Sequence, residues 1–74
     1  MTMRSPTAAE FYAEFLGSRA ARKGEIIRRK VRDVERFVGR RPFLDEMKRR
    51  GFPVVENAGQ FVVFCNAEPI RCLV

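Results

Sequence analysis

Apolar residues recur at helical spacing in three stretches between residues 7 and 50. The first stretch follows Thr7, which has Glu10 three residues later, the spacing of a capping box that starts a helix. Behind this box the apolar positions fall at i, i+1, i+4 and i+5, and Gly17 is expected to end the helix. We expect this apolar stripe to pack against the rest of the domain or against a partner protein, and its members are Phe11, Tyr12, Phe15 and Leu16.

A second and longer helix is predicted from Ser18 or Gly24 to Val38. Its apolar seam has the spacing i, i+4, i+7 and i+11 and consists of Ile27, Val31, Val34 and Val38. In this register several arginines share the helix face opposite the seam, and the acids beside them are too few to neutralise them. These arginines are Arg22, Arg28, Arg29, Arg32 and Arg36.

A third helix is predicted from Pro42 to Arg50, and it buries Phe43, Leu44 and Met47. Gly51 suits the left-handed position that follows a helix, with Phe52 closing back onto Met47 in a Schellman-type contact.

From Pro53 onward the apolar period changes from 3.6 to 2. Two strands are predicted around the Ala58-Gly59 turn, over 54–57 and 60–65, and the second is apolar on both faces, as in a central strand. A short third strand is predicted over 70–74, at the sheet edge beside the second strand. The expected fold is therefore α+β, with two or three N-terminal helices packed on a small antiparallel two- or three-stranded sheet, in the order α-α-α-β-β-β.

Length and composition limit the functions that this chain can have. Its 74 residues allow one small domain, spanning 1–74, and they include no His, the usual general base and the commonest metal ligand. We therefore expect no enzyme, no catalytic residues, no metal site and no cofactor. Cys65 and Cys72 fit neither a redox motif nor a zinc-ligand pair and are expected to be buried thiols. Without a secretory signal or a membrane-length apolar run, a cytoplasmic protein with no membrane partner is expected.

The net charge of +6 is concentrated in the middle of the chain. Residues 19–50 hold 13 Lys and Arg against 5 Asp and Glu, a net charge of +8, whereas each end has a net charge of −1. Arg predominates in this segment, and its planar fork binds phosphate with two hydrogen bonds. The expected function is non-catalytic binding to nucleic-acid phosphates through Arg28, Arg29, Arg32, Arg36, Arg40, Arg41, Lys48, Arg49 and Arg50.

The type of nucleic acid depends on how the helices are joined. Two helices connected by the turn at 39–42 and followed by a β-hairpin have the order of part of a winged helix-turn-helix. The predicted second helix is too long for the positioning helix of that motif, and the third carries few of the Asn, Gln or Ser residues that read base edges. Binding to the nucleic-acid backbone, or to RNA through its shape, is therefore favoured over sequence-specific recognition of DNA. RNA is slightly favoured over DNA as the ligand.

A different class of function fits the same composition. The basic residues could dock onto an acidic surface of a larger complex, so that the chain acts as an adaptor, an inhibitor or a small subunit. The apolar face of the N-terminal helix supports this alternative, because it could fill a groove on a partner or pair with a second copy in a homodimer.

The last third of the chain carries a succession of short motifs. The sequence from Met47 to Phe52 is Met-Lys-Arg-Arg-Gly-Phe. It is followed by Val54-Val55, by Gly59 and then by Phe-Val-Val-Phe at 61–64. This order of helix, Gly-Phe pair, strand, Gly turn and strand resembles that of HicA-type RNA-cleaving toxins over residues 43–74. The resemblance implies an α-β-β-β element compatible with RNA binding. That family places a catalytic His just after the turn glycine, where this chain has Gln60 and Phe61, so RNA cleavage is not implied.

Overall fold

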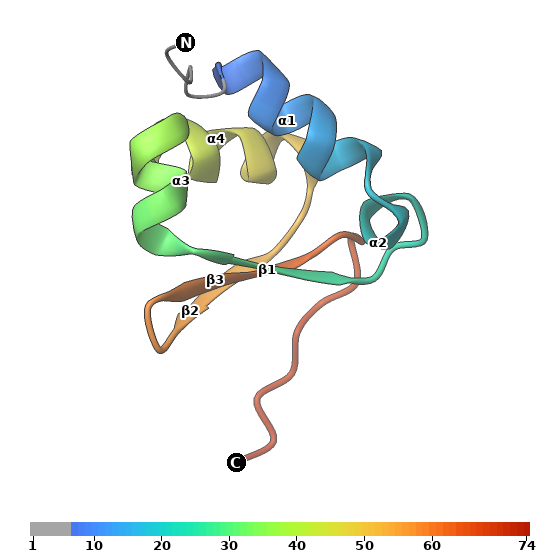
Figure 1. The fold of residues 1–74 in the computed structure, drawn as a ribbon. Coiled ribbons are helices and arrows are strands. Elements are labelled where there is room, and N and C mark those ends of the chain that lie inside the picture. Colours follow the sequence, from blue (N-terminus) through green and yellow to red (C-terminus); the bar gives the residue numbers. More distant parts are fainter. Residues whose placement is uncertain (1–6) are drawn as a thin grey trace, which may run out of the picture.

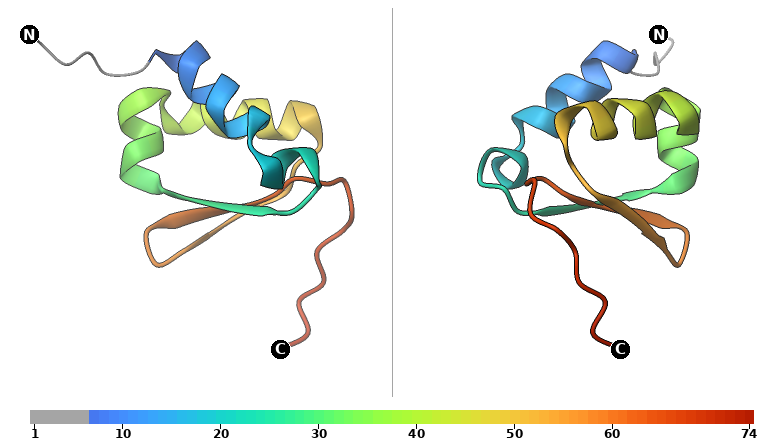
Figure 2. Two further views of the ribbon diagram at one scale, coloured as in Figure 1. Left: turned by 45° about the vertical axis from the view of Figure 1, so that its right-hand side comes forward. Right: turned by 180° about the vertical axis from the view of Figure 1, so that it is seen from behind.

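The computed structural model describes residues 7–74 and shows a three-stranded antiparallel sheet with helices packed on one face (Figure 1). The strand order across the sheet is β1-β3-β2. Helices α1, α3 and α4 lie on the same side of the sheet and leave its other face without a covering helix (Figure 2). In chain order the elements are α1 (Ala8–Gly17), α2 (Arg19–Arg22), β1 (Ile26–Lys30), α3 (Val31–Phe37), α4 (Arg40–Arg50), β2 (Val54–Asn57) and β3 (Gln60–Phe64).

The α+β class and the antiparallel sheet agree with the sequence prediction, but the chain order differs from it. A strand, β1, lies between the helices, so the order is α-α-β-α-α-β-β rather than α-α-α-β-β-β.

The start of α1 is as predicted. The backbone N–H of Glu10 donates to Thr7 Oγ1 at 3.1 Å, which satisfies one of the free donors of the first turn. The helix ends at Gly17, and Ser18 then caps α2 by accepting a hydrogen bond from the N–H of Ala21 at 3.2 Å.

The single long helix predicted to end at Val38 is wrong. Gly24, at φ 73°, follows α2, and the chain then runs as strand β1 from Ile26 to Lys30 before α3 begins. The strand forms because its backbone pairs with β3, with Ile27 opposite Val63. The apolar spacing did not distinguish the two structures, because Ile27 and Val34 face the core in either one.

Helix α4 begins at Arg40, two residues before the predicted start, and its end is as predicted. Gly51 adopts the left-handed conformation at φ 75°. The N–H of Phe52 donates to the Met47 carbonyl at 2.9 Å and the N–H of Gly51 to that of Lys48 at 3.0 Å, which together form a Schellman motif.

The β2–β3 hairpin and the central position of β3 are also confirmed. Ala58 and Gly59 both have positive φ, 51° and 73°, as a tight turn between twisted strands requires. The third strand predicted over 70–74 is wrong, and so is the α-β-β-β order implied by the resemblance to HicA-type toxins. The edge of β3 that this strand would have used is taken by β1. The N–H of Cys65 donates to the Glu25 carbonyl at 3.1 Å, and residues 67–74 then extend away from the sheet (Figure 1).

The core lies between the inner face of the sheet and the helices, and three aromatic rings dominate it. Phe43 from α4 stacks on Phe61 of β3 with centroids 5.4 Å apart, and the Phe15 ring of α1 meets Phe43 edge-on at 5.8 Å. Cys65 is a buried free thiol as expected, and burial raises its pKa. The expectation for Cys72 is wrong, because this thiol is exposed on the extended segment.

Candidate nucleic-acid interface

Helices α3 and α4 form a helix-turn-helix unit with a connection of two residues, Val38 and Gly39. Gly39 has φ 94° and donates its N–H to the Val34 carbonyl at 2.9 Å, while its own carbonyl accepts the N–H of Phe43 at 3.2 Å. A Cβ at this position would lie 3.3 Å from Pro42 Cδ. The positive φ and the close approach both favour glycine, which permits the sharp change of direction between the helices.

The five arginines expected to share one helix face do not do so, because Arg22 is on α2 and two others are on β1. Arg28 is exposed, on the side of β1 that alternates away from the core. Arg29 is half-buried and points the other way, with its guanidinium carbon 5.5 Å from the centre of the Phe15 ring. Arg28 and Arg29 are therefore on opposite faces of the strand, and neither belongs to the face of α3 that carries Arg32 and Arg36.

Arg32 and Arg36 are one turn apart on α3, on the face opposite the buried Val34. Both are exposed, and the guanidinium of Arg36 lies 5.6 Å from the centre of the Phe37 ring. Neither makes an ion pair within residues 7–74, so both positive charges are available to a ligand.

Arg40 connects the first turn of α4 to the β-hairpin. Its Nη2 atom lies 2.7 Å from Glu56 Oε1 on β2, and its guanidinium carbon is 5.2 Å from the centre of the Phe61 ring. The charge of Arg40 is therefore balanced within the domain.

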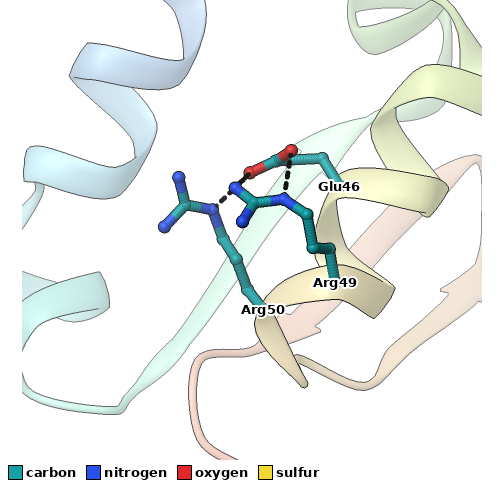
Figure 3. A network of polar contacts seen from close by, with 3 residues as sticks. All are labelled: Glu46, Arg49 and Arg50. Atoms are coloured by element: carbon teal, nitrogen blue, oxygen red, sulfur yellow. Dashed lines mark hydrogen bonds and ion pairs between the residues drawn. The ribbon is translucent and has the colours of Figure 1, made fainter.

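Arg49 and Arg50 share a single carboxylate, that of Glu46 (Figure 3). Arg49 donates from Nη2 to Oε2 at 2.6 Å and from Nε to Oε1 at 3.2 Å, and Arg50 donates from Nε to Oε2 at 2.6 Å. The hydrogen bonds from Arg49 and then from Arg50 lower the pKa of the Glu46 carboxyl, and the same pairing raises the pKa of Arg49.

Arg41 and Lys48 remain on the solvent face of α4, together with Asp45. All three are exposed and lie on the side opposite the buried Phe43 and Met47. Within the described part of the chain none of the three makes an ion pair. We call the four available cations of the two helices the α3–α4 cationic face, and they are Arg32, Arg36, Arg41 and Lys48.

Shallow hollows follow this face from α4 to the hairpin. One is lined by Arg40, Arg41, Leu44 and Asp45, and Leu44 also lines a second hollow that includes Lys48. A third hollow lies between Arg32 and the hairpin and includes Glu56, the ion-pair partner of Arg40. The first two hollows therefore meet at Leu44, and the Arg40–Glu56 ion pair connects the linings of the first and the third.

The apolar stripe of α1 is used inside the domain. Phe15 is buried, and Phe11, Tyr12 and Leu16 are half-buried against the core. Burial, with a smaller contribution from the Glu46 carboxylate, raises the pKa of Tyr12. The stripe thus packs against the rest of the domain, the first of its two expected roles, and its use in a homodimer stays a prediction.

The pairing of Glu46 and Glu56 with arginines was not predicted from the sequence. Glu46 lies three and four residues before Arg49 and Arg50, so its pairing could have been found from helical spacing. The pair between Arg40 and Glu56 spans 16 residues and depends on how the hairpin returns to α4.

Comparison with protein-family models, with curated proteins and with solved structures finds no significant match to this chain. Between residues 7 and 74, no helix combines the length and apolar character needed to cross a bilayer. The same part of the chain contains no group of three or more Cys, Asp or Glu placed to hold a metal ion.

Proposed function

We propose that this protein binds duplex DNA without catalysis, as a winged helix-turn-helix domain that places α4 in the major groove. The observation that carries this proposal is the α3–Gly39–α4 unit followed by the β2–β3 hairpin, with β1 completing the sheet in the order β1-β3-β2. In the wider class of helix-turn-helix domains the second helix enters the major groove and the first crosses the DNA backbone. The assignment of DNA binding from this arrangement is an analogy of fold, supported by the charges described above.

The length of α3 removes the main objection to this motif. The sequence pattern predicted one helix up to Val38, too long for a positioning helix, whereas α3 has 7 residues. Its exposed Arg32 and Arg36 suit contacts with phosphates beside the groove, and Arg41 and Lys48 project from the solvent face of α4.

Helix geometry favours duplex DNA over duplex RNA as the ligand. The major groove of B-DNA, about 12 Å wide, admits an α-helix, whereas the deep and narrow major groove of A-form RNA does not. RNA binding, which the sequence slightly favoured, becomes an alternative outcome of the experiment.

The experiment is an anisotropy titration of labelled duplex DNA at low salt, with an RNA hairpin and polyglutamate as competitors. The variant Arg41→Gln/Lys48→Gln is expected to lose at least tenfold in DNA affinity. The control Arg19→Gln/Lys23→Gln removes the same charge from α2 and the residue after it, and it is expected to bind like the wild type. Circular dichroism should show the same helix content for all three proteins.

Three results would count against the proposal. Tighter binding to the RNA hairpin than to DNA would replace DNA by RNA as the ligand. Displacement of DNA by polyglutamate at equal charge concentration would favour an acidic protein surface. Equal losses in the two double variants would mean that net charge, rather than the α3–α4 cationic face, drives binding.

A further inference from the structure

We propose that the solvent face of α4 recognises G·C base pairs, with Arg41 and Lys48 donating to guanine and Asp45 accepting from cytosine. This inference rests on the proposed binding of duplex DNA and adds the base preference of the same site. The observation behind it is that Asp45 stands unpaired among cations.

The placement of Asp45 is not explained by charge pairing within the helix. Arg41 lies four residues before it and Arg49 four residues after it, spacings at which ion pairs commonly form on a helix. Arg49 instead binds Glu46, and Asp45 has no ion-pair partner in residues 7–74. A carboxylate on a surface that only contacted phosphates would oppose binding, whereas a carboxylate facing base edges can accept a hydrogen bond from cytosine N4.

The other two side chains complete a consistent readout. Arg41, Asp45 and Lys48 follow one side of α4 over about 10 Å, the rise of seven helical residues, which corresponds to about three base pairs. Arg and Lys donate to the O6 and N7 acceptors of guanine, and α4 contains no Asn or Gln, the residues that pair with adenine. Arg41, Asp45 and Lys48 therefore each match a group that a G·C pair presents in the major groove.

The test compares binding to two pools of duplexes of equal length, one randomised over G and C and the other over A and T. Phosphate contacts are the same in both pools, so the ratio of the two affinities reports base contacts together with the sequence-dependent shape of the duplex, and a change in a base atom separates the two. The wild type is expected to bind the G·C pool about tenfold more tightly, and replacement of guanine by 7-deazaguanine, which lacks the N7 acceptor, should remove most of that difference.

The variant Asp45→Asn tests the carboxylate itself, since an amide suits adenine. The ratio of the affinity for the G·C pool to that for the A·T pool is expected to fall severalfold, even if the loss of a negative charge tightens binding to both pools. Glu68→Gln, an equal change of charge on the exposed segment after β3, should leave the ratio unchanged.

The outcomes separate this inference from the proposed function. Equal wild-type affinity for the two pools, or a ratio that Asp45→Asn leaves unchanged, overturns the G·C readout and leaves DNA binding intact. Absence of binding to either pool at low salt overturns the proposed function itself.

Discussion

The salt dependence of the proposed DNA binding should reveal which cations lie against the duplex. Each Lys or Arg that neutralises phosphate charge, either at a phosphate or from within the groove between the phosphates, contributes about −0.9 to the slope of log affinity against log salt concentration. Binding through the four residues of the α3–α4 cationic face gives a slope of about −3.6, which is about a 150-fold loss of affinity between 50 and 200 mM salt. Binding through all nine basic residues indicated by the sequence would give a slope of about −8 and a loss approaching 10⁵-fold.

Two double variants of α4 compare the available cations with the paired ones on the same helix. Arg41→Gln/Lys48→Gln removes two available charges, so its slope is expected to be shallower by about two. Arg49→Gln/Arg50→Gln removes the same charge from α4, but Glu46 already holds both guanidinium groups. Glu46 balances one of these two positive charges, so the slope of this second variant is expected to become shallower by at most about one.

The assay is a series of anisotropy titrations on one duplex at several salt concentrations. A wild-type slope near −8, or an equal reduction of slope in the two double variants, would refute the assignment of the four contacting residues.

Three further predictions concern stability and reactivity. Phe43→Ala should lower the free energy of unfolding by about 3–5 kcal/mol, which is comparable with the whole stability of a domain this small. The variant should therefore largely lose the thermal unfolding transition seen by circular dichroism. A transition like that of the wild type would contradict the burial of Phe43 in the core. Because the pKa of Glu46 is lowered in the native state, its ion pairs should stabilise the fold above about pH 4.3 and cease to do so as the pH falls through the lowered pKa. Urea unfolding at a series of pH values should show this loss, and Glu46→Gln should weaken the dependence. A thiol reagent at neutral pH should modify Cys72 rapidly and Cys65 only on unfolding, and equal rates would show that Cys65 is accessible.

The parts of the fold that the sequence predicted are those specified by neighbouring residues. The cap at Thr7, the Schellman motif at Gly51 and the turn at Ala58-Gly59 each depend on side chains or backbone angles within a few positions. Such signals act before any tertiary contact forms, which is why these elements appear where they were expected.

The candidate site could be predicted only as a set of basic residues. Helical spacing was sufficient to pair Glu46 with Arg49 and Arg50, but the pairing of Arg40 with Glu56 and the position of Arg29 over Phe15 required the folded chain. These contacts distinguish the exposed cations without an ion pair from those that are paired with an acid or packed on an aromatic ring inside the domain.

The sequence alone determined the α+β class, the α4 helix, the hairpin and the concentration of positive charge in residues 19–50. Only the tertiary structure decided that Ile26–Lys30 is a strand, that the segment after Phe64 is not part of the sheet, and that α3 is short enough for a helix-turn-helix. The physical reason is the pairing of β1 with β3, whose residues lie 30 to 38 positions further along the chain. The apolar side chains of 26–38 can face a core as a helix or as a strand followed by a helix, and the hydrogen bonds offered by β3 select the second.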